Sequence, residues 1–285
     1  MNHLSPSPVS RREFLGRSTI GAAGLVFGFG LVSAARADSA RKIPFGVQLY
    51  SLREQCKTDL PGMIALVSQI GFKGVEFAGY FGHGAKELRQ VLDDHGIVAC
   101  GTHAPFETVT GDKLKATIEF NHTIGNKFII IPWLEGTTKQ AWLDLAATCN
   151  DIADRLKPEG LFLGYHSHKH DFAKFDGEYS WDIFLDHTKS EIIAQVDVAN
   201  CRDGNADPLT EMRKRPDRLR TMHIKAYGAG PEAVIGEDDT DWKGIFEFCE
   251  TKGGTDWYVL EHETSKDPVA AVKRSYESLK KLGKV

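Results

Sequence analysis

Residues 161–168 read Leu-Phe-Leu-Gly-Tyr-His-Ser-His, a short apolar run that ends in two histidines. The run follows Gly160, a residue suited to ending the amphipathic stretch at 139–156. An apolar run of this length after a helical stretch is typical of a buried parallel strand. The segment therefore predicts a strand whose carboxyl end carries His166 and His168.

The same alternation of apolar run and amphipathic stretch extends in both directions along the chain. It predicts strands at 43–49, 74–77, 97–102, 128–132, 161–166, 192–198, 219–225 and 257–261. It predicts helices at 60–70, 85–95, 113–124, 139–156, 181–187, 208–213, 242–251 and 268–282. Eight strand–helix pairs in one chain of 285 residues indicate an α/β protein, a single-domain (β/α)8 barrel over residues 38–285.

A doubly wound open sheet is the competing architecture. Such sheets bind nucleotides through a glycine-rich loop after the first strand. Here residues 48–53 read Gln-Leu-Tyr-Ser-Leu-Arg, without a glycine. The lack of a glycine-rich loop after the first strand therefore favours the barrel.

The composition is that of an ordinary globular protein. The chain is 41% hydrophobic and 26% charged, with a formal net charge of −4. Proteins that bind nucleic acid usually carry a basic face, so this balance argues against a nucleic-acid partner.

The N-terminal 37 residues have the pattern of an export signal. Ser10-Arg11-Arg12-Glu13-Phe14-Leu15 precedes a Gly/Ala-rich apolar run at 20–32, and Ala35-Arg36-Ala37 offers a small-residue cleavage site. The arginine pair resembles a twin-arginine signal, which implies the twin-arginine export machinery as a partner and a periplasmic location. A membrane anchor is the alternative, but the run is short for a membrane span. Cleavage after Ala37 would remove four Arg and one Glu and change the net charge from −4 to −7.

Most predicted strands end in an ionisable side chain, and barrel enzymes carry their catalytic groups at these ends. The strand-end residues are Glu76, His103, His166 with His168, Asp197, His223 with Lys225, and Glu261 with Glu263. Residues two apart in a strand point the same way, so His166 shares a face with His168, and His223 with Lys225.

Four of these residues come from the four consecutive predicted strands five to eight: His166, Asp197, His223 and Glu261. Imidazole nitrogens and carboxylate oxygens are ligands for divalent cations. The quartet therefore predicts a site for one divalent metal ion: Mn, Mg, Co or Zn.

Four short motifs resemble the strand ends of the xylose isomerase-like barrel superfamily of sugar isomerases and epimerases. They are Gly74-Val75-Glu76-Phe77, Gln195-Val196-Asp197, Met222-His223-Ile224-Lys225 and Val259-Leu260-Glu261. The resemblance implies that Asp197, His223 and Glu261 bind one divalent cation, Mn as the first expectation. It also implies a proton shuttle between two glutamates, one on each face of the sugar.

The chain departs from that pattern at the first metal-binding glutamate, where it carries His166. The surrounding Tyr165-His166-Ser167-His168 resembles a subgroup with a Tyr-His-Asn-His signature, with serine in place of asparagine. An imidazole can bind a metal or act as an acid or base, but it does not copy a carboxylate. Glu76, Glu263, His168 or Lys225 would then supply the second proton transfer.

The resulting hypothesis is a metal-dependent sugar isomerase or epimerase. The metal polarises a carbonyl, Glu261 removes the neighbouring proton, and a second group returns it to the enediolate elsewhere. If the next carbon carries a leaving group, the same enolate expels it, which would make the protein a lyase or hydrolase of 3-keto-glycosides. A non-catalytic periplasmic sugar-binding barrel is the third possibility.

The remaining expectations concern the substrate and partners. His103, Trp133 and Glu263 are expected to contact a small sugar or glycoside, and Trp133 could stack on its apolar face. A homo-oligomer is compatible with the sequence.

Overall fold

The computed structural model describes residues 41–285, so the predicted export signal lies outside the described residues. The strands are β1 Phe45–Gln48, β2 Gly74–Phe77, β3 Val98–His103, β4 Phe128–Ile131, β5 Phe162–His166, β6 Lys174–Phe175, β7 Glu178–Tyr179, β8 Ile193–Gln195, β9 Thr221–Ile224 and β10 Trp257–Leu260. The helices are α1 Arg53–Ile70, α2 Ala85–Asp94, α3 Lys113–Ile124, α4 Lys139–Leu156, α5 Ser180–Asp186, α6 Val198–Asp203, α7 Pro208–Lys214, α8 Trp242–Thr251 and α9 Pro268–Lys281. Short 3-10 turns are η1 Leu49–Leu52, η2 Phe106–Thr108, η3 Lys157–Glu159, η4 Lys169–Phe172 and η5 Pro216–Arg218.

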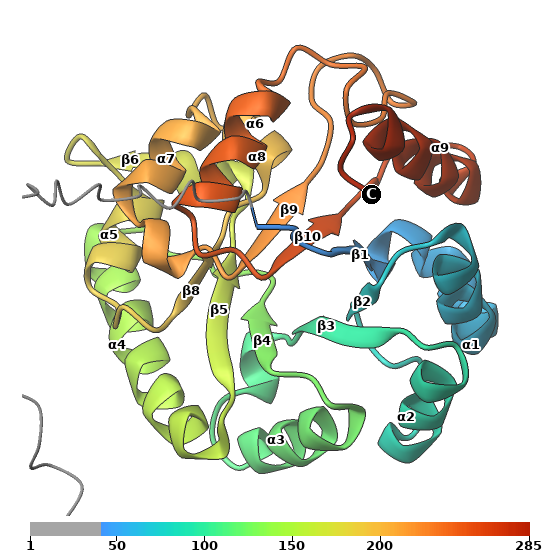
Figure 1. Ribbon diagram of the computed structural model, residues 1–285. Helices are drawn as coiled ribbons and strands as arrows, with labels where there is room; N and C mark the ends of the chain where they lie inside the picture. Colours follow the sequence, from blue (N-terminus) through green and yellow to red (C-terminus); the bar gives the residue numbers. More distant parts are fainter. Residues whose placement is uncertain (1–40) are drawn as a thin grey trace, which may run out of the picture. The chain divides into compact units, whose positions relative to one another are not determined.

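Eight parallel strands form a barrel with helices around it (Figure 1). The order is β8-β5-β4-β3-β2-β1-β10-β9, so neighbours in the sheet follow the order of the chain. The ring closes between β8 and β9 through a single parallel bridge, Asp197 to His223, in which the His223 N–H donates to the Val196 carbonyl at 3.0 Å. The predicted (β/α)8 barrel is confirmed.

The strands form because their apolar side chains are buried on both faces, as parallel sheets between helices require. All four residues of β4, Phe-Ile-Ile-Ile, are buried. The helices α4, α8 and α9 begin at side-chain caps, from Thr138, Asp241 and Asp267 respectively.

Three local features differ from the sequence prediction. The first helix begins at Arg53, seven residues earlier than predicted, and is interrupted at Asp59, whose φ of −151° is not helical. The strand predicted at 192–198 ends at Gln195, because Asp197 instead caps the unpredicted α6 by accepting from the Asn200 N–H. A small antiparallel hairpin, β6 with β7, lies in the predicted loop after β5.

Within residues 41–285, no helix has the length and apolar character that a membrane crossing requires.

Candidate metal centre at the carboxyl ends of the strands

The barrel brings together the four side chains of the predicted metal quartet. His166 ends β5, Asp197 follows β8, His223 lies in β9 and Glu261 follows β10. One ligand atom from each lies within 4.8 Å of the others, and all four side chains are buried. These residues are therefore placed to hold a single cation.

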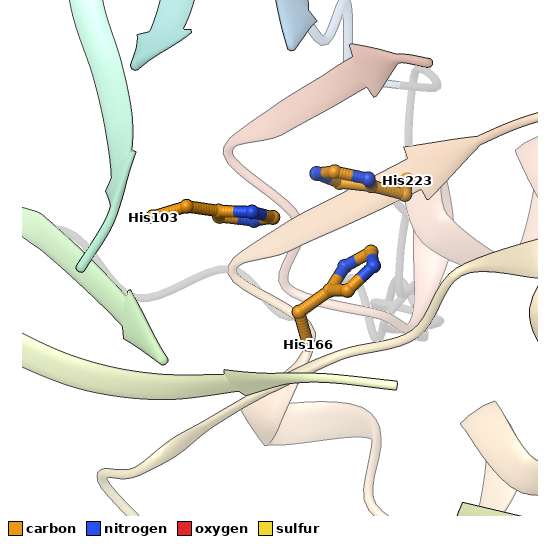
Figure 2. Close-up of side chains that lie close together, drawn as sticks. All are labelled: His103, His166 and His223. Carbon is orange, nitrogen blue, oxygen red and sulfur yellow. The ribbon is translucent and has the colours of Figure 1, made fainter. Parts of the chain in front are cut away.

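Three imidazoles face one another at this centre, from β3, β5 and β9 (Figure 2). The ring of His103 is nearly parallel to that of His223, with centroids 5.3 Å apart, and the His166 ring lies 4.4 Å from that of His223. His103, predicted as a substrate contact, thus lies directly beside the metal quartet, and with His166 and His223 it forms a second group of possible ligands.

One buried oxygen atom without a hydrogen-bond partner tests whether the quartet fits a cation. The Oδ2 atom of Asp197 is buried and has no hydrogen-bond partner, while Oδ1 accepts from the Asn200 N–H at 2.7 Å. A buried carboxylate oxygen without a partner is costly, and metal coordination is one of the few ways to satisfy it. The donor set of two imidazoles and two carboxylates fits a divalent cation.

Gln195 contacts two of the three imidazoles at this centre, His166 and His103. Its Oε1 accepts from His166 Nδ1 at 3.0 Å and from His103 Nε2 at 2.9 Å. Its Nε2 donates to Glu76 Oε1 and to Thr221 Oγ1, both at 2.9 Å, which sets the orientation of the amide. With its proton on Nδ1, a neutral His166 keeps the lone pair of Nε2 for a metal.

Glu76 orients the ring of His223 through a hydrogen bond to its Nε2 atom. Its Oε2 lies 2.6 Å from His223 Nε2, which leaves Nδ1 of that ring toward Glu261 at 3.1 Å and Asp197 at 3.8 Å. Carboxylates that accept the outer N–H of a metal-binding histidine orient the ring in many metal sites. Glu76 is fully buried, and it also accepts from Gln48 Nε2 at 2.8 Å.

A glycine in β3, Gly101, leaves space for the Glu76 carboxylate. A Cβ atom added to Gly101 would lie 2.2 Å from Glu76 Oε1, closer than any real contact. Glu76 was predicted as a proton-transfer group, but it does not line the mouth pocket, and its hydrogen bonds are directed to protein side chains.

The charges at the centre are unequally distributed. Burial lowers the pKa of His166 well below its usual value, and the neighbouring His223 and His103 act in the same direction, so its imidazole is neutral and able to bind a metal. Burial opposes protonation of His223 too, but Glu76 and Glu261 outweigh it and raise its pKa to about 10.

The pKa values of the two carboxylates in the quartet are also shifted in opposite directions. Burial raises the pKa of Asp197 to about 7 against the opposing charge of Lys225. Burial would also raise the pKa of Glu261, yet Lys225 and His223 outweigh it and keep this carboxylate charged. A cation held between the two would favour the charged form of both.

Lys225, predicted as a catalytic group, forms an ion pair with Glu263 and lies 3.9 Å from both Asp197 Oδ2 and Glu261 Oε2. Burial disfavours its charge, but Asp197, Glu261 and Glu263 raise the pKa of Lys225 above its usual value. The lysine is therefore a fixed positive charge at the edge of the centre.

A pocket of about 360 Å³ opens above the quartet. It contains the predicted residues His103, Trp133, His166, His168, Glu261 and Glu263, together with Tyr50 and Pro132. We call it the mouth pocket. Its volume is within the range of small-molecule sites.

The sequence motifs predict no role for three further residues of this centre: Gln48, Gln195 and Thr221. Each is a fully buried polar residue within a short apolar strand. A polar side chain inside such a strand requires a buried partner, and this was the signal available in the sequence.

The model of the family described as "Xylose isomerase-like TIM barrel" matches residues 64–282. The chain belongs to the xylose isomerase-like TIM barrel family. The resemblance expected from the strand-end motifs is thereby confirmed at the level of the family.

Curated relatives of this family member include two inosose dehydratases. That of Geobacillus thermodenitrificans is 23% identical over 261 residues, covering 76% of this chain and 84% of the relative. That of Clostridium tetani is 23% identical over 266 residues, covering 78% and 85%.

Solved structures with a similar fold include two sugar-modifying enzymes. A sugar phosphate isomerase/epimerase from Parabacteroides distasonis is 25% identical with a TM-score of 0.73, covering 83% of this chain and 97% of that one. An L-ribulose 3-epimerase is 16% identical with a TM-score of 0.64, covering 85% and 94%.

Proposed function

We propose that this xylose isomerase-like barrel is a divalent-metal-dependent enzyme that enolises a keto-sugar and acts as an isomerase or epimerase. The observation that carries the proposal is the convergence of His166, Asp197, His223 and Glu261, with Asp197 Oδ2 buried and without a hydrogen-bond partner. The epimerase among the similar structures and the dehydratases among the relatives agree with a carbohydrate substrate. A bound cation, with Mn as the first candidate, would supply Lewis-acid polarisation of the carbonyl and its neighbouring hydroxyl.

Glu261 is the proposed base. It is charged, it lines the mouth pocket, and only 4% of its surface is exposed. A carboxylate withdrawn from water and opposite the substrate can take the proton next to the carbonyl. Lys225, 3.9 Å away, stabilises the negative charge that develops as the enediolate forms.

The second proton transfer is assigned to His168, which lines the mouth pocket. Its Nδ1 is buried without a hydrogen-bond partner. Glu263 lies in the same pocket, paired with Lys225, and contributes to substrate binding. Glu76 becomes a positioning residue in this proposal, because its hydrogen bonds hold His223 and Gln195 in place.

A second candidate function is a lyase acting on 3-keto-glycosides. It is favoured by the relatives that are dehydratases, since eliminating water and eliminating an alcohol next to an enolate are the same type of step. Glu261 would accept the proton from C2, a C1–C2 double bond would form, and the C1–O bond would break with its electron pair on oxygen. The departing oxygen takes up one proton and leaves as an alcohol.

Both candidate functions are tested by measuring metal content and catalytic turnover on the same protein. The mature protein is loaded with Mn, Mg, Co or Zn, and its metal content and its turnover of free ketoses and 3-keto-glycosides are measured. Epimerised ketose supports the isomerase, and released alcohol supports the lyase. Absence of metal binding under loading conditions would favour a non-catalytic sugar-binding barrel instead.

Replacing Glu261 by glutamine tests the base directly. We expect Glu261→Gln to lower kcat by about 10²- to 10⁴-fold, because the amide cannot accept the proton. Circular dichroism should show an intact fold. Full activity of this variant would contradict the proposal.

We also propose that the protein is exported to the periplasm through its twin-arginine sequence and cleaved after Ala37. The support is the sequence of residues 10–37. N-terminal sequencing of protein from the periplasmic fraction, compared with an Arg11→Lys, Arg12→Lys variant, tests this. Unprocessed protein retained in the cytoplasm of both strains would contradict it.

A further inference from the structure

A second pocket, of about 520 Å³, adjoins the mouth pocket. The two share Trp133 and His168 in their walls. Trp133 is 49% exposed, an unusual state for a large aromatic side chain. Its indole is held from behind by His170, with ring centroids 4.1 Å apart, and by the edge contact with His168 at 4.7 Å.

The second pocket is lined by both aromatic and polar side chains. Trp133, His170 and Phe172 give it aromatic surfaces. Asn200, Asp203 and Asn205 add amide and carboxylate groups, and Asp203 is held by an ion pair with Lys169 at 3.2 Å. None of these residues belongs to the metal quartet.

This combination suits a sugar ring. One face of a pyranose is a set of C–H groups that can pack on an aromatic plane, and its hydroxyls require polar partners. An aglycone without hydroxyls would use the aromatic surfaces but leave the amides and the carboxylate unused.

The geometry points to a subsite for a second sugar ring in this pocket, attached to the keto-sugar ring that lies in the mouth pocket. The inference rests on the proposed function, and it narrows the substrate class to keto-derivatives of disaccharides or longer glycosides. Trp133 would contact both rings, and His168 would lie beside the bond that joins them.

Three substrates that share one keto ring test the subsite: 3-keto-glucose, methyl 3-keto-glucoside and a glucose disaccharide oxidised at C3 of its non-reducing ring. For the metal-loaded wild type, we expect kcat/KM for the disaccharide to exceed that for the methyl glycoside about tenfold, which corresponds to about 1.4 kcal/mol. In Trp133→Ala and in Asp203→Ala this ratio should fall toward one.

Tyr50→Ala is the matched control. Tyr50 is 44% exposed and lines the mouth pocket, but it does not line the second pocket. Its loss should change kcat/KM for the disaccharide and the methyl glycoside by the same factor and leave their ratio as in the wild type.

The outcomes separate this inference from the proposed function. Turnover of the single-ring substrates without any preference for the disaccharide, in the wild type and in Trp133→Ala alike, overturns the subsite and leaves the proposed function intact. If no substrate is turned over, the proposed function fails, and calorimetric titration with the unoxidised disaccharide and with glucose decides the subsite. Disaccharide binding that is tighter than glucose binding and that weakens in Trp133→Ala supports it, and equal or absent binding overturns it.

Discussion

At the scale of single residues, Gln195 and Glu76 do more to define the centre than their position in the sequence suggests. The amide of Gln195 contacts His103, His166, Glu76 and Thr221 through four hydrogen bonds. Because it accepts from the imidazoles and donates to the carboxylate, it sets which nitrogen of His166 is free to bind a metal. The quartet depends on this arrangement as well as on its own four side chains.

Replacing Gln195 by leucine should therefore weaken metal binding. We expect Gln195→Leu to lower the affinity for the divalent cation by about 10- to 100-fold, as loss of residues that orient ligands generally does. Titration calorimetry measures the change. Gln90→Leu is the control, because Gln90 on α2 pairs only with the exposed Asp94. Equal affinities in the two variants would contradict the role of Gln195.

At the scale of elements, the turn η4 after β5 depends on one buried carboxylate. Asp171 accepts from the Tyr165 hydroxyl and from the His168 N–H, both at 2.6 Å, and His170 Nε2 lies 3.3 Å away. The hydrogen bonds of Asp171 connect the end of β5 to the turn η4, whose residues Lys169, His170 and Phe172 line the second pocket. Burial raises the pKa of Asp171 to about 7, although His170 and the two hydrogen bonds oppose the shift.

The raised pKa predicts a pH dependence of stability. Since the folded state holds the proton on Asp171 more tightly than the unfolded chain, the contribution is complete below about pH 4. It is lost as the pH rises to about 7. Asp171→Asn mimics the protonated form, so we expect its free energy of unfolding to depend less on pH between 5 and 8 than that of the wild type. Urea unfolding at each pH measures this, and parallel curves for the two proteins would contradict it.

At the scale of the whole molecule, the barrel closes beside the candidate metal centre. A single bridge between Asp197 and His223 joins β8 to β9, whereas the other neighbouring strands share two or more register pairs. The quartet includes both residues of this bridge together with His166 and Glu261 on either side. A cation bound there would connect strands on both sides of the β8–β9 junction, which has the fewest paired residues. We call this junction the seam of the barrel.

Metal removal should therefore loosen this seam first. At a free metal concentration of 100 times Kd, binding stabilises the fold by about 2.7 kcal/mol. We expect chelation to lower Tm and to speed hydrogen exchange of the His223 amide more than that of β4. The variant Asp197→Asn should show a smaller response to chelation. Uniform exchange across the barrel with and without metal would contradict a role at the seam.

The architecture and the four candidate metal-binding residues could be predicted from the amino-acid sequence alone. The alternation of apolar runs and amphipathic stretches predicts the barrel because parallel strands buried on both faces need continuous apolar sequence. The strand-end positions of His166, Asp197, His223 and Glu261 follow from it, because all strands of a barrel deliver their carboxyl ends to one rim.

The residues that surround the quartet depend on long-range contacts of the folded chain. The contacts of Glu76 and Gln195 join residues from β2, β8 and β9, and no local pattern specifies such long-range pairs. The start of the first helix at Arg53 and the cap that Asp197 forms on α6 also depend on packing and on hydrogen bonds that local propensity does not contain. The boundary between the two pockets at Trp133 exists for the same reason, since the loop after β4 meets the turn after β5 only in the folded chain.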